Sequence, residues 1–344
     1  MNSNWWDDDI EVIQGRMPDN SAPFRTVDSI RDLPDDWIAF IGDTHSDYEA
    51  LEYNIGICES LGVKNAIHVG DFGYMLNGHP GQNEYETDGM LADAREDFGF
   101  ELIVIDGNHD NHALYHRNNP STALRKVTKN AEFWYAPRGA VLDIPVSSAL
   151  TYENIENPST VVALDTRRFG FMGGAQSVNV AGKYVFDGER EVWQWNLPTE
   201  EEKELVRDKQ WWDDEYPTLD DVECMIEKVG ERGLDVLVSH EAPTQKHLTS
   251  QVSVSAGLAK ELKRTSKYLS KLVQKTKPQL NVHGHWHQFV SATYKGTQIL
   301  SLDKEKTYGN LVFMRKSDLG LVPVNAYLRN NGHQVSIFKH KNRY

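Results

Sequence analysis

Short apolar runs alternate with stretches of helical spacing along the first third of the chain. The runs at 37–42, 65–70 and 101–106 predict strands, and a helix is expected near 90–98 between the last two. Strand, helix, strand, helix and strand in succession favour a parallel sheet with right-handed crossovers. Ligands bind beyond the carboxyl ends of the strands in such sheets, so we expect the chemistry to lie in the polar segments that follow these runs.

Three further helices are predicted from apolar positions at helical spacing. The first ends at Gly62, and Ser46 with Glu49 has the pattern of a capping box at its start. Thr218 is expected to cap the second helix, and the third ends before Pro278.

The middle of the chain is less regular. Segments 161–168 and 169–174 predict two short strands with a turn between them, and 180–218 combines four tryptophans with many acids. The run at 235–240 predicts a strand that ends in a histidine. After a short strand at 280–282, two apolar stretches on either side of a Lys-Gly turn favour paired strands.

These patterns predict an α/β protein with one main domain over 37–344, preceded by an acidic extension at 1–36. Within the domain, 180–218 is an aromatic-rich insertion. Its tryptophans offer flat surface for a lid or a substrate wall, such as one that stacks on a nucleobase. Packing into a satellite core is the simpler interpretation, and we favour it.

The net charge narrows the range of partners. The 344 residues include 51 acidic and 36 basic side chains, for a formal net charge of −15, so passive binding of nucleic acid is disfavoured. The first residues have neither the basic nor the apolar region of a secretion signal, and no apolar run is long enough to cross a bilayer. Cys58 and Cys224 are expected to be buried thiols, and the protein is expected to be cytoplasmic without a membrane partner.

Side chains with metal-binding chemistry follow the predicted strands. They are Asp43 with His45, Asp71, Asn108 with His109, His240, and His285 with His287. Imidazole and carboxylate together favour manganese, zinc, iron or nickel, whereas an all-oxygen set would favour magnesium or calcium. Two ions about 3.5–4 Å apart need an anion between them, and Asp71 is the natural candidate. Such ions acidify a bound water and hold phosphoryl oxygens, so that hydroxide attacks in line.

The motifs GDTH, GDFG, GNHD, SHEAP and GHWH occur in this order over residues 42–287. The series resembles the calcineurin-like metallophosphoesterase superfamily. This resemblance implies two packed mixed β-sheets flanked by helices, a four-layer αββα sandwich. It also implies a dinuclear metal centre that hydrolyses phosphate esters, with manganese favoured and zinc, iron or nickel as alternatives.

The resemblance further implies a role for each motif residue. One ion would be held by Asp43, His45 and His287. The other would be held by Asn108, His240 and His285. Asp71 would be shared by both ions, and His109 would protonate the leaving oxygen or steady the phosphoryl group.

Two features depart from the wider family pattern. Tyr74 stands where many members have the Asp that orients the catalytic histidine, so either Asp110 orients His109 or the leaving group needs less protonation. Asp106 stands before GNHD, where the serine/threonine protein-phosphatase branch usually has Arg. The residues 74–76 also differ from that branch, which argues against membership of it.

Several functions remain open from the sequence alone. The expected substrate is a small phosphodiester or phosphomonoester, with a nucleotide or cyclic nucleotide favoured. Arg167 and His112 are candidate substrate contacts, although each is also a plausible surface residue. A metal-dependent nuclease would need a basic track, and the nearest is the helix at 260–277. A metal-free, non-enzymatic scaffold would be expected to have damaged ligands, whereas this chain has all seven.

Overall fold

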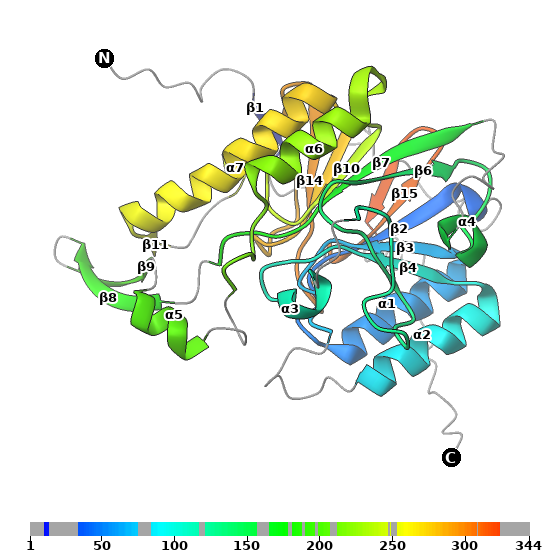
Figure 1. Ribbon diagram of the computed structural model, residues 1–344, viewed down its shortest axis with the longest axis horizontal. Coiled ribbons are helices and arrows are strands. Elements are labelled where there is room, and N and C mark those ends of the chain that lie inside the picture. Colours follow the sequence, from blue (N-terminus) through cyan, green and yellow to red (C-terminus); the bar gives the residue numbers. More distant parts are fainter. Residues whose placement is uncertain are drawn as a thin grey trace.

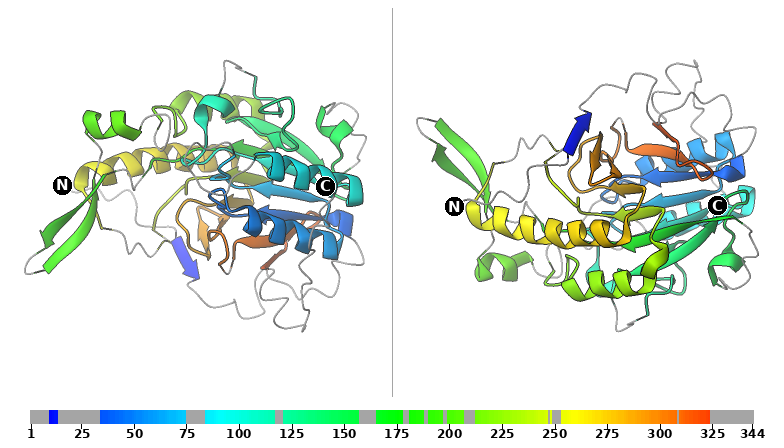
Figure 2. Two further views of the ribbon diagram at one scale, coloured as in Figure 1. Left: turned by 90° about the horizontal axis from the view of Figure 1, so that it is seen from below. Right: turned by 90° about the horizontal axis from the view of Figure 1, so that it is seen from above.

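Two large mixed β-sheets pack face to face, and helices cover their outer faces (Figure 1, Figure 2). This is the architecture of a computed structural model of the chain. It describes residues 10–13, 34–74, 84–116, 121–156, 165–177, 181–187, 190–196, 199–206, 212–246, 248, 253–307 and 309–323. The predicted α/β fold of two packed mixed sheets flanked by helices is confirmed.

The first sheet contains the parallel strands that the apolar runs predicted. In order, its strands are β16 (Leu321–Pro323), β15 (Leu311–Arg315), β2 (Trp37–Ile41), β3 (Asn65–His68), β4 (Glu101–Val104) and β5 (Trp134–Tyr135). Strands β2 to β5 are parallel, and β15 is antiparallel to β2. Every residue of β2, β3 and β4 is buried, because both faces of the sheet are covered.

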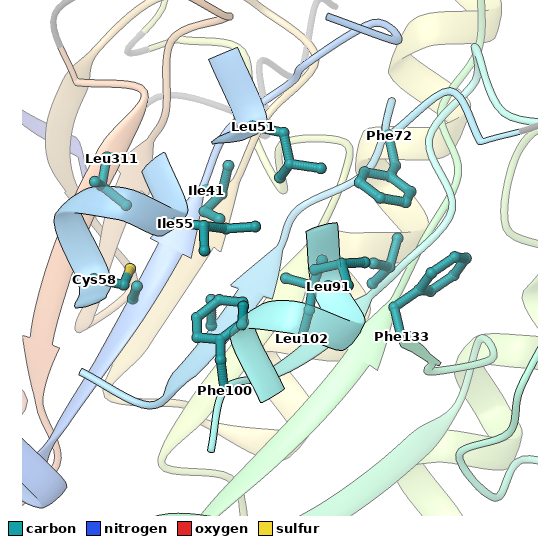
Figure 3. Close-up of a cluster of buried hydrophobic side chains, with 14 of the residues drawn as sticks. Ile41, Leu51, Ile55, Cys58, Phe72, Leu91, Phe100, Leu102, Phe133 and Leu311 are labelled. Carbon is teal, nitrogen blue, oxygen red and sulfur yellow. The ribbon is translucent and has the colours of Figure 1, made fainter. Parts of the chain in front are cut away.

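Helices α1 (Tyr48–Leu61) and α2 (Glu84–Phe98) cover the outer face of this sheet and enclose one of the hydrophobic cores (Figure 3). Gly62 ends α1 in the left-handed conformation, as predicted. The predicted cap at Ser46 is wrong, since Asp47 caps the helix by accepting from the amide of Ala50 at 3.0 Å. The Ser46 hydroxyl instead donates to the carbonyl of Gly73 at 2.9 Å, a tertiary contact that the local pattern does not include.

The second sheet contains seven of the described strands. In order they are β1 (Ile10–Ile13), β13 (Val290–Tyr294), β14 (Thr297–Ser301), β12 (Leu280–His283), β10 (Val236–Ser239), β7 (Thr166–Met172) and β6 (Ala140–Pro145). Helices α6 (Leu219–Val229) and α7 (Ala256–Thr276) cover its outer face over a third core. Thr218 caps α6 with a capping box, as expected. The core between the two sheets joins residues of both.

The middle of the chain is more regular than its sequence indicated. Residues 166–172 form one continuous strand, β7, where two strands with a turn were predicted, because β6 and β10 pair along both of its edges. Residues 161–164 of that prediction lie outside the described residues. The hairpin β8 (Ala181–Asp187) and β9 (Arg190–Asn196) pairs with β11 (Ser253–Val254) in a small third sheet. This sheet and α5 (Glu200–Val206) extend away from the sandwich beside the start of α7 (Figure 1).

Four short helical segments complete the described elements: η1 (Pro34–Asp36), α3 (His112–Tyr115), α4 (Tyr152–Glu156) and η3 (Gly230–Arg232). Across the part of the chain that the structure describes, no helix combines the length and apolarity needed to span a bilayer. Cys58 is buried as expected, but Cys224 is exposed, and both are free thiols.

Candidate metal centre

Five loops meet where strands of the two sheets end. They follow β2, β3 and β4 in the six-stranded sheet and β10 and β12 in the seven-stranded sheet, and they carry the five sequence motifs. Four motif residues have a left-handed backbone: φ is 45° at His45, 53° at Asp71, 68° at His285 and 49° at His287. Residues other than glycine rarely adopt this conformation, and such exceptions cluster at functional sites.

Asp71 lies between histidines from different loops. Its Oδ2 is 3.3 Å from Nε2 of His45, and its Oδ1 is 3.3 Å from Nε2 of His240. The backbone amide of His109 donates to Oδ1 at 2.7 Å, which fixes the carboxylate. Each oxygen of Asp71 therefore faces a different imidazole.

Asp43 joins the loop after β2 to the loop after β12. Its Oδ2 is 3.2 Å from Nε2 of His287 and accepts from the amide of His285 at 2.9 Å. Together with His45 and Asp71, Asp43 and His287 form what we call the strand-end cluster, whose ligand atoms all lie within 4.8 Å of one another. This group is able to hold a metal ion.

Asn108 and His240 extend the site on the other side of Asp71. The Oδ1 of Asn108 is 3.1 Å from Nε2 of His240. On its other side, the His240 ring donates from Nδ1 to the carbonyl of Val69 at 2.8 Å. This bond leaves Nε2 to face the site, as expected for a metal-binding imidazole. The ring of His285 lies 5.2 Å from that of His240, centroid to centroid.

The carboxylates of the site favour protonation of the neighbouring imidazoles. Burial lowers the pKa of His45, but hydrogen bonds to Asp71 and to a second carboxylate outweigh burial and raise it to about 11. Burial also opposes protonation of His240, yet the charge of Asp71 helps to raise its pKa to about 10. The pKa of Asp71 is held well below its usual value because these charges overcome its burial. Metal binding would release the protons that the imidazoles carry.

The residues present fit divalent metal ions. Asp43 Oδ1 and His285 Nε2 are buried with no hydrogen-bond partner among the described residues. The glycines of the motifs leave room for the carboxylates: a Cβ at Gly107 would lie 2.1 Å from Asp71 Oδ1, and one at Gly284 would lie 2.1 Å from Asp43 Oδ1. Carboxylate and imidazole donors without thiolate suit transition metals such as manganese or zinc.

His109 lies beside the cluster, with its ring centroid 5.9 Å from that of His45. Burial lowers the pKa of His109, and the charge of Asp71 opposes this effect. Tyr74 does not replace the missing aspartate, because its hydroxyl donates to Asp88 at 2.6 Å on the α2 side of the sheet. The carboxylate of Asp110 accepts from three backbone amides, including those of the glycines at positions 73 and 107, so it joins two loops.

The two candidate substrate contacts lie elsewhere. Arg167 is at the start of β7, where its guanidinium donates to the carbonyl of Lys316 at 2.7 Å and approaches Asp235, the residue before β10. Since β7 and β10 are parallel, Arg167 is at the opposite end of the sheet from His240. His112 is fully buried, so neither a substrate contact nor a solvated surface position describes it. Of the tryptophans at 180–218, Trp212 is buried against His112, with ring centroids 5.3 Å apart.

The sequence did not reveal several carboxylates near the site. Glu305 accepts from Nδ1 of His45 at 2.9 Å, and Glu241 lies with its Oε2 3.7 Å from Nε2 of His285. Glu215 is fully buried and hydrogen-bonded to Ser177. Glu241 follows His240 directly and was the one residue that its motif could have indicated, whereas the others lie in segments without a recognisable pattern.

A second group of potential ligands lies in the segment that follows β4. It consists of Asp106, His112 and His116, which we call the Asp106 cluster. Here the guanidinium of Arg138 donates to Asp106 Oδ2 at 2.6 and 2.9 Å. The ring of His116 lies between Asp106 and Asp214, at 3.3 Å and 2.8 Å.

Comparisons with known proteins support one family. A family model described as calcineurin-like phosphoesterase matches residues 37–289. No curated protein matches the chain significantly.

Solved structures give more distant similarities. The protein TT1561 of Thermus thermophilus is 11% identical with a TM-score of 0.45, over 83% of this chain and 96% of that one. A Staphylococcus aureus protein described as a candidate 5′-nucleotidase is 16% identical with a TM-score of 0.40, over 84% of this chain and only 54% of that one. The phosphopantetheinyl hydrolase of Mycobacterium tuberculosis is 13% identical with a TM-score of 0.37, over 80% and 94%. Similarities this distant do not bear on the substrate.

Proposed function

The chain belongs to the calcineurin-like phosphoesterase family, and from that premise we propose that it is a dinuclear metal-dependent hydrolase of phosphate esters. The observation that carries the proposal is the position of Asp71, whose two oxygens each lie 3.3 Å from a different imidazole. A carboxylate with that placement is suited to bridge two cations.

The ligand set follows from the side chains around Asp71. One ion would be held by Asp43, His45 and His287, which share the strand-end cluster with Asp71. The other would be held by Asn108, His240 and His285. When bound, the two ions supply the Lewis acidity that activates water and neutralises charge on the phosphate. We favour manganese, with zinc, iron or nickel as alternatives.

The protein's own groups orient the substrate and move the proton. His109, anchored through its backbone amide to Asp71, would protonate the leaving oxygen or donate a hydrogen bond to the phosphoryl group. Its lowered pKa favours the neutral ring before substrate binds. A bound anionic phosphate would favour the protonated form, so that the acid is prepared when it is needed.

A small phosphorylated substrate is favoured over a nucleic-acid strand. The basic helix α7, the nearest candidate for a nucleic-acid track, has part of its charge neutralised: Arg264 pairs with Glu261 at 2.7 Å and Lys271 pairs with Glu223 at 2.7 Å. We infer a nucleotide or cyclic nucleotide, and hence a phosphodiester or phosphomonoester.

Assays on the manganese-reconstituted protein test this proposal. p-Nitrophenyl phosphate and bis(p-nitrophenyl) phosphate separate monoester from diester activity, and Asp71→Asn is the matched variant. We expect hydrolysis of at least one compound, reduced about 10³-fold by the substitution because several kcal/mol of charge stabilisation is lost. No hydrolysis of either compound, or equal rates for both proteins, contradicts a catalytic role. Fewer than about one bound ion per chain after reconstitution favours a metal-free scaffold.

A further inference from the structure

A chain of three buried polar side chains leads from the centre of the site to the insertion segment. Asn108 Nδ2 donates to Ser177 Oγ at 3.2 Å, and Ser177 Oγ donates to Glu215 Oε2 at 2.9 Å. All three side chains are buried, with exposed fractions of 1%, 1% and 0%. Ser177 follows β7 and Glu215 precedes α6, so the contacts join two segments that lie outside the five motifs.

The direction of these hydrogen bonds follows from the donors around Glu215. Its Oε1 accepts from the amide of Ser177 at 2.7 Å and from Nε2 of Gln176 at 3.1 Å. Burial raises the pKa of Glu215 to about 8, and the hydrogen bonds from the amide and hydroxyl of Ser177 oppose this shift. With the carboxylate ionised, as a neighbouring metal ion favours, the serine hydroxyl donates its single hydrogen to Oε2 at 2.9 Å. The hydroxyl can then only accept from Asn108, which requires the NH₂ group of that amide to face Ser177.

This polarity determines which atom of Asn108 faces the site. With Nδ2 turned to Ser177, Oδ1 is directed toward Nε2 of His240 at 3.1 Å. An amide oxygen can ligate a metal ion, whereas an amide NH₂ group cannot. We propose that Glu215 is a positioning residue that acts through Ser177 to keep the oxygen of Asn108 directed at the metal ion. This inference rests on the proposed function, because it assigns Asn108 as a ligand.

The substitution Glu215→Gln provides a sharp test because it keeps the shape and reverses the polarity. In the variant, the amide oxygen at position 215 accepts from the Ser177 amide and from Gln176 Nε2, the two donors that bind Oε1 in the unsubstituted protein. The NH₂ group of the new side chain therefore faces the Ser177 hydroxyl. The Ser177 hydroxyl must then accept from the new NH₂ group and point its own hydrogen at Asn108. The NH₂ group of Asn108 is also a donor, so two donors face each other. Relief of this conflict requires Asn108 to turn its oxygen away from the site.

Isothermal titration calorimetry of the chelator-treated full-length protein with Mn²⁺ measures the effect on metal affinity. Partners behind a metal ligand typically contribute about 10–100-fold to affinity, so we expect the affinity for one of two ions to fall about 100-fold in Glu215→Gln and about 10-fold in Ser177→Ala. Thermal melting of both variants without metal should remain cooperative, which separates weaker positioning of Asn108 from loss of the fold. Asp213→Asn removes one charge from an exposed position in the same segment and should leave both affinities unchanged.

The Ser177→Ala variant decides between mechanisms, because it breaks the chain of hydrogen bonds without changing charge. Weaker manganese binding in both Glu215→Gln and Ser177→Ala supports the proposal. Weaker binding in Glu215→Gln alone indicates simple loss of negative charge and overturns it, as does unchanged binding in both. If the unsubstituted protein binds no Mn²⁺, the proposed function fails independently of this inference.

Discussion

The strand-end cluster and the Asp106 cluster contain the same kinds of side chain, yet only the first resembles a metal centre. Both bring histidine and aspartate atoms within 4.8 Å of one another, and the aspartates of both clusters are buried. In the Asp106 cluster a fixed cation is already present, since Arg138 donates twice to Asp106. Among the described residues, Asp43 and Asp71 form ion pairs with histidines only.

The difference shows that ligand type and distance do not by themselves define a metal site. The charge of Arg138 helps to hold the pKa of Asp106 well below its usual value, against the effect of burial. A divalent ion bound there would be repelled by the adjacent guanidinium. Among the described residues, Asp43 and Asp71 of the strand-end cluster have no arginine or lysine partner. A bound metal ion would therefore interact with carboxylates that no guanidinium or ammonium group neutralises.

The largest expected effect comes from a substitution of Asp43 in the strand-end cluster. Replacing it by Asn should reduce phosphate-ester hydrolysis about 10³-fold, because the proposed ligand loses its charge while its shape is kept. Rates with saturating Mn²⁺ and the metal content of the purified protein measure the effect. A variant that keeps both its metal and its rate would show that Asp43 is not a ligand.

The Asp106 cluster should respond in stability instead of activity. Arg138→Met leaves Asp106 as a buried charge without its strongest partner, which typically costs about 3–5 kcal/mol of unfolding free energy. Urea denaturation of the variant measures this loss, while the number of bound ions should stay the same. A loss of bound metal without a loss of stability would reverse the assignment of the two clusters.

In each cluster, Nδ1 of one histidine lies next to a carboxylate outside the cluster: Glu305 beside His45, and Asp214 beside His116. The two pairs allow a matched comparison. Glu305→Gln weakens the partner of His45 and should lower metal affinity about 10–100-fold. Asp214→Asn weakens one of the two carboxylate partners of His116. Because the Asp214 side chain is 55% exposed, the substitution should change the unfolding free energy by less than about 1 kcal/mol. Manganese titration and denaturation of both variants test this contrast, and equal metal affinities would remove it.

The pH dependence of stability sharpens the comparison further. Burial lowers the pKa of His112 to about 3, and the charge of Asp106 opposes the shift. In the unfolded chain His112 takes up a proton near pH 6.5, whereas in the folded chain it stays neutral down to about pH 3. The free energy of unfolding therefore decreases as the pH falls from 6.5 toward 3. The slope is up to about 1.4 kcal/mol per pH unit.

The variant His112→Phe isolates this contribution. Both ring nitrogens of His112 are buried with no hydrogen-bond partner among the described residues, so the substitution removes no bond found there. Unfolding free energies between about pH 7 and 4 should fall less steeply in the variant than in the parent protein. Parallel curves would show that His112 does not control the acid sensitivity.

The sequence predicted the parts of the fold that depend on local pattern. The runs that became β2, β3 and β4 are continuous and apolar because both faces of the sheet are buried, and their carboxyl ends carry the motif residues. The family inferred from those motifs is confirmed. The cap of α1 was predicted one residue early, because Ser46 makes a long-range bond to Gly73 that competes with the local one.

Contacts between distant segments were beyond the reach of the pattern. Arg138 meets Asp106, and Glu215 meets Ser177, without any motif or period that joins them. The hairpin at 181–196 alternates poorly between apolar and polar residues, so its strands were not predicted. Arg167 was predicted to follow a strand at 161–168, but β7 begins at Thr166, so Arg167 lies at the start of the strand and away from the site.

The left-handed backbone at His45, Asp71, His285 and His287 has a consequence for adaptation of this protein. The left-handed conformation costs most L-amino acids about 1–2 kcal/mol per residue, aspartate less, and glycine nothing. Selection for heat resistance alone would therefore favour glycine at these positions and would remove the proposed metal ligands. If the proposed function holds, stability and activity are opposed at these four positions, and selection for stability alone would yield a more stable protein without hydrolase activity.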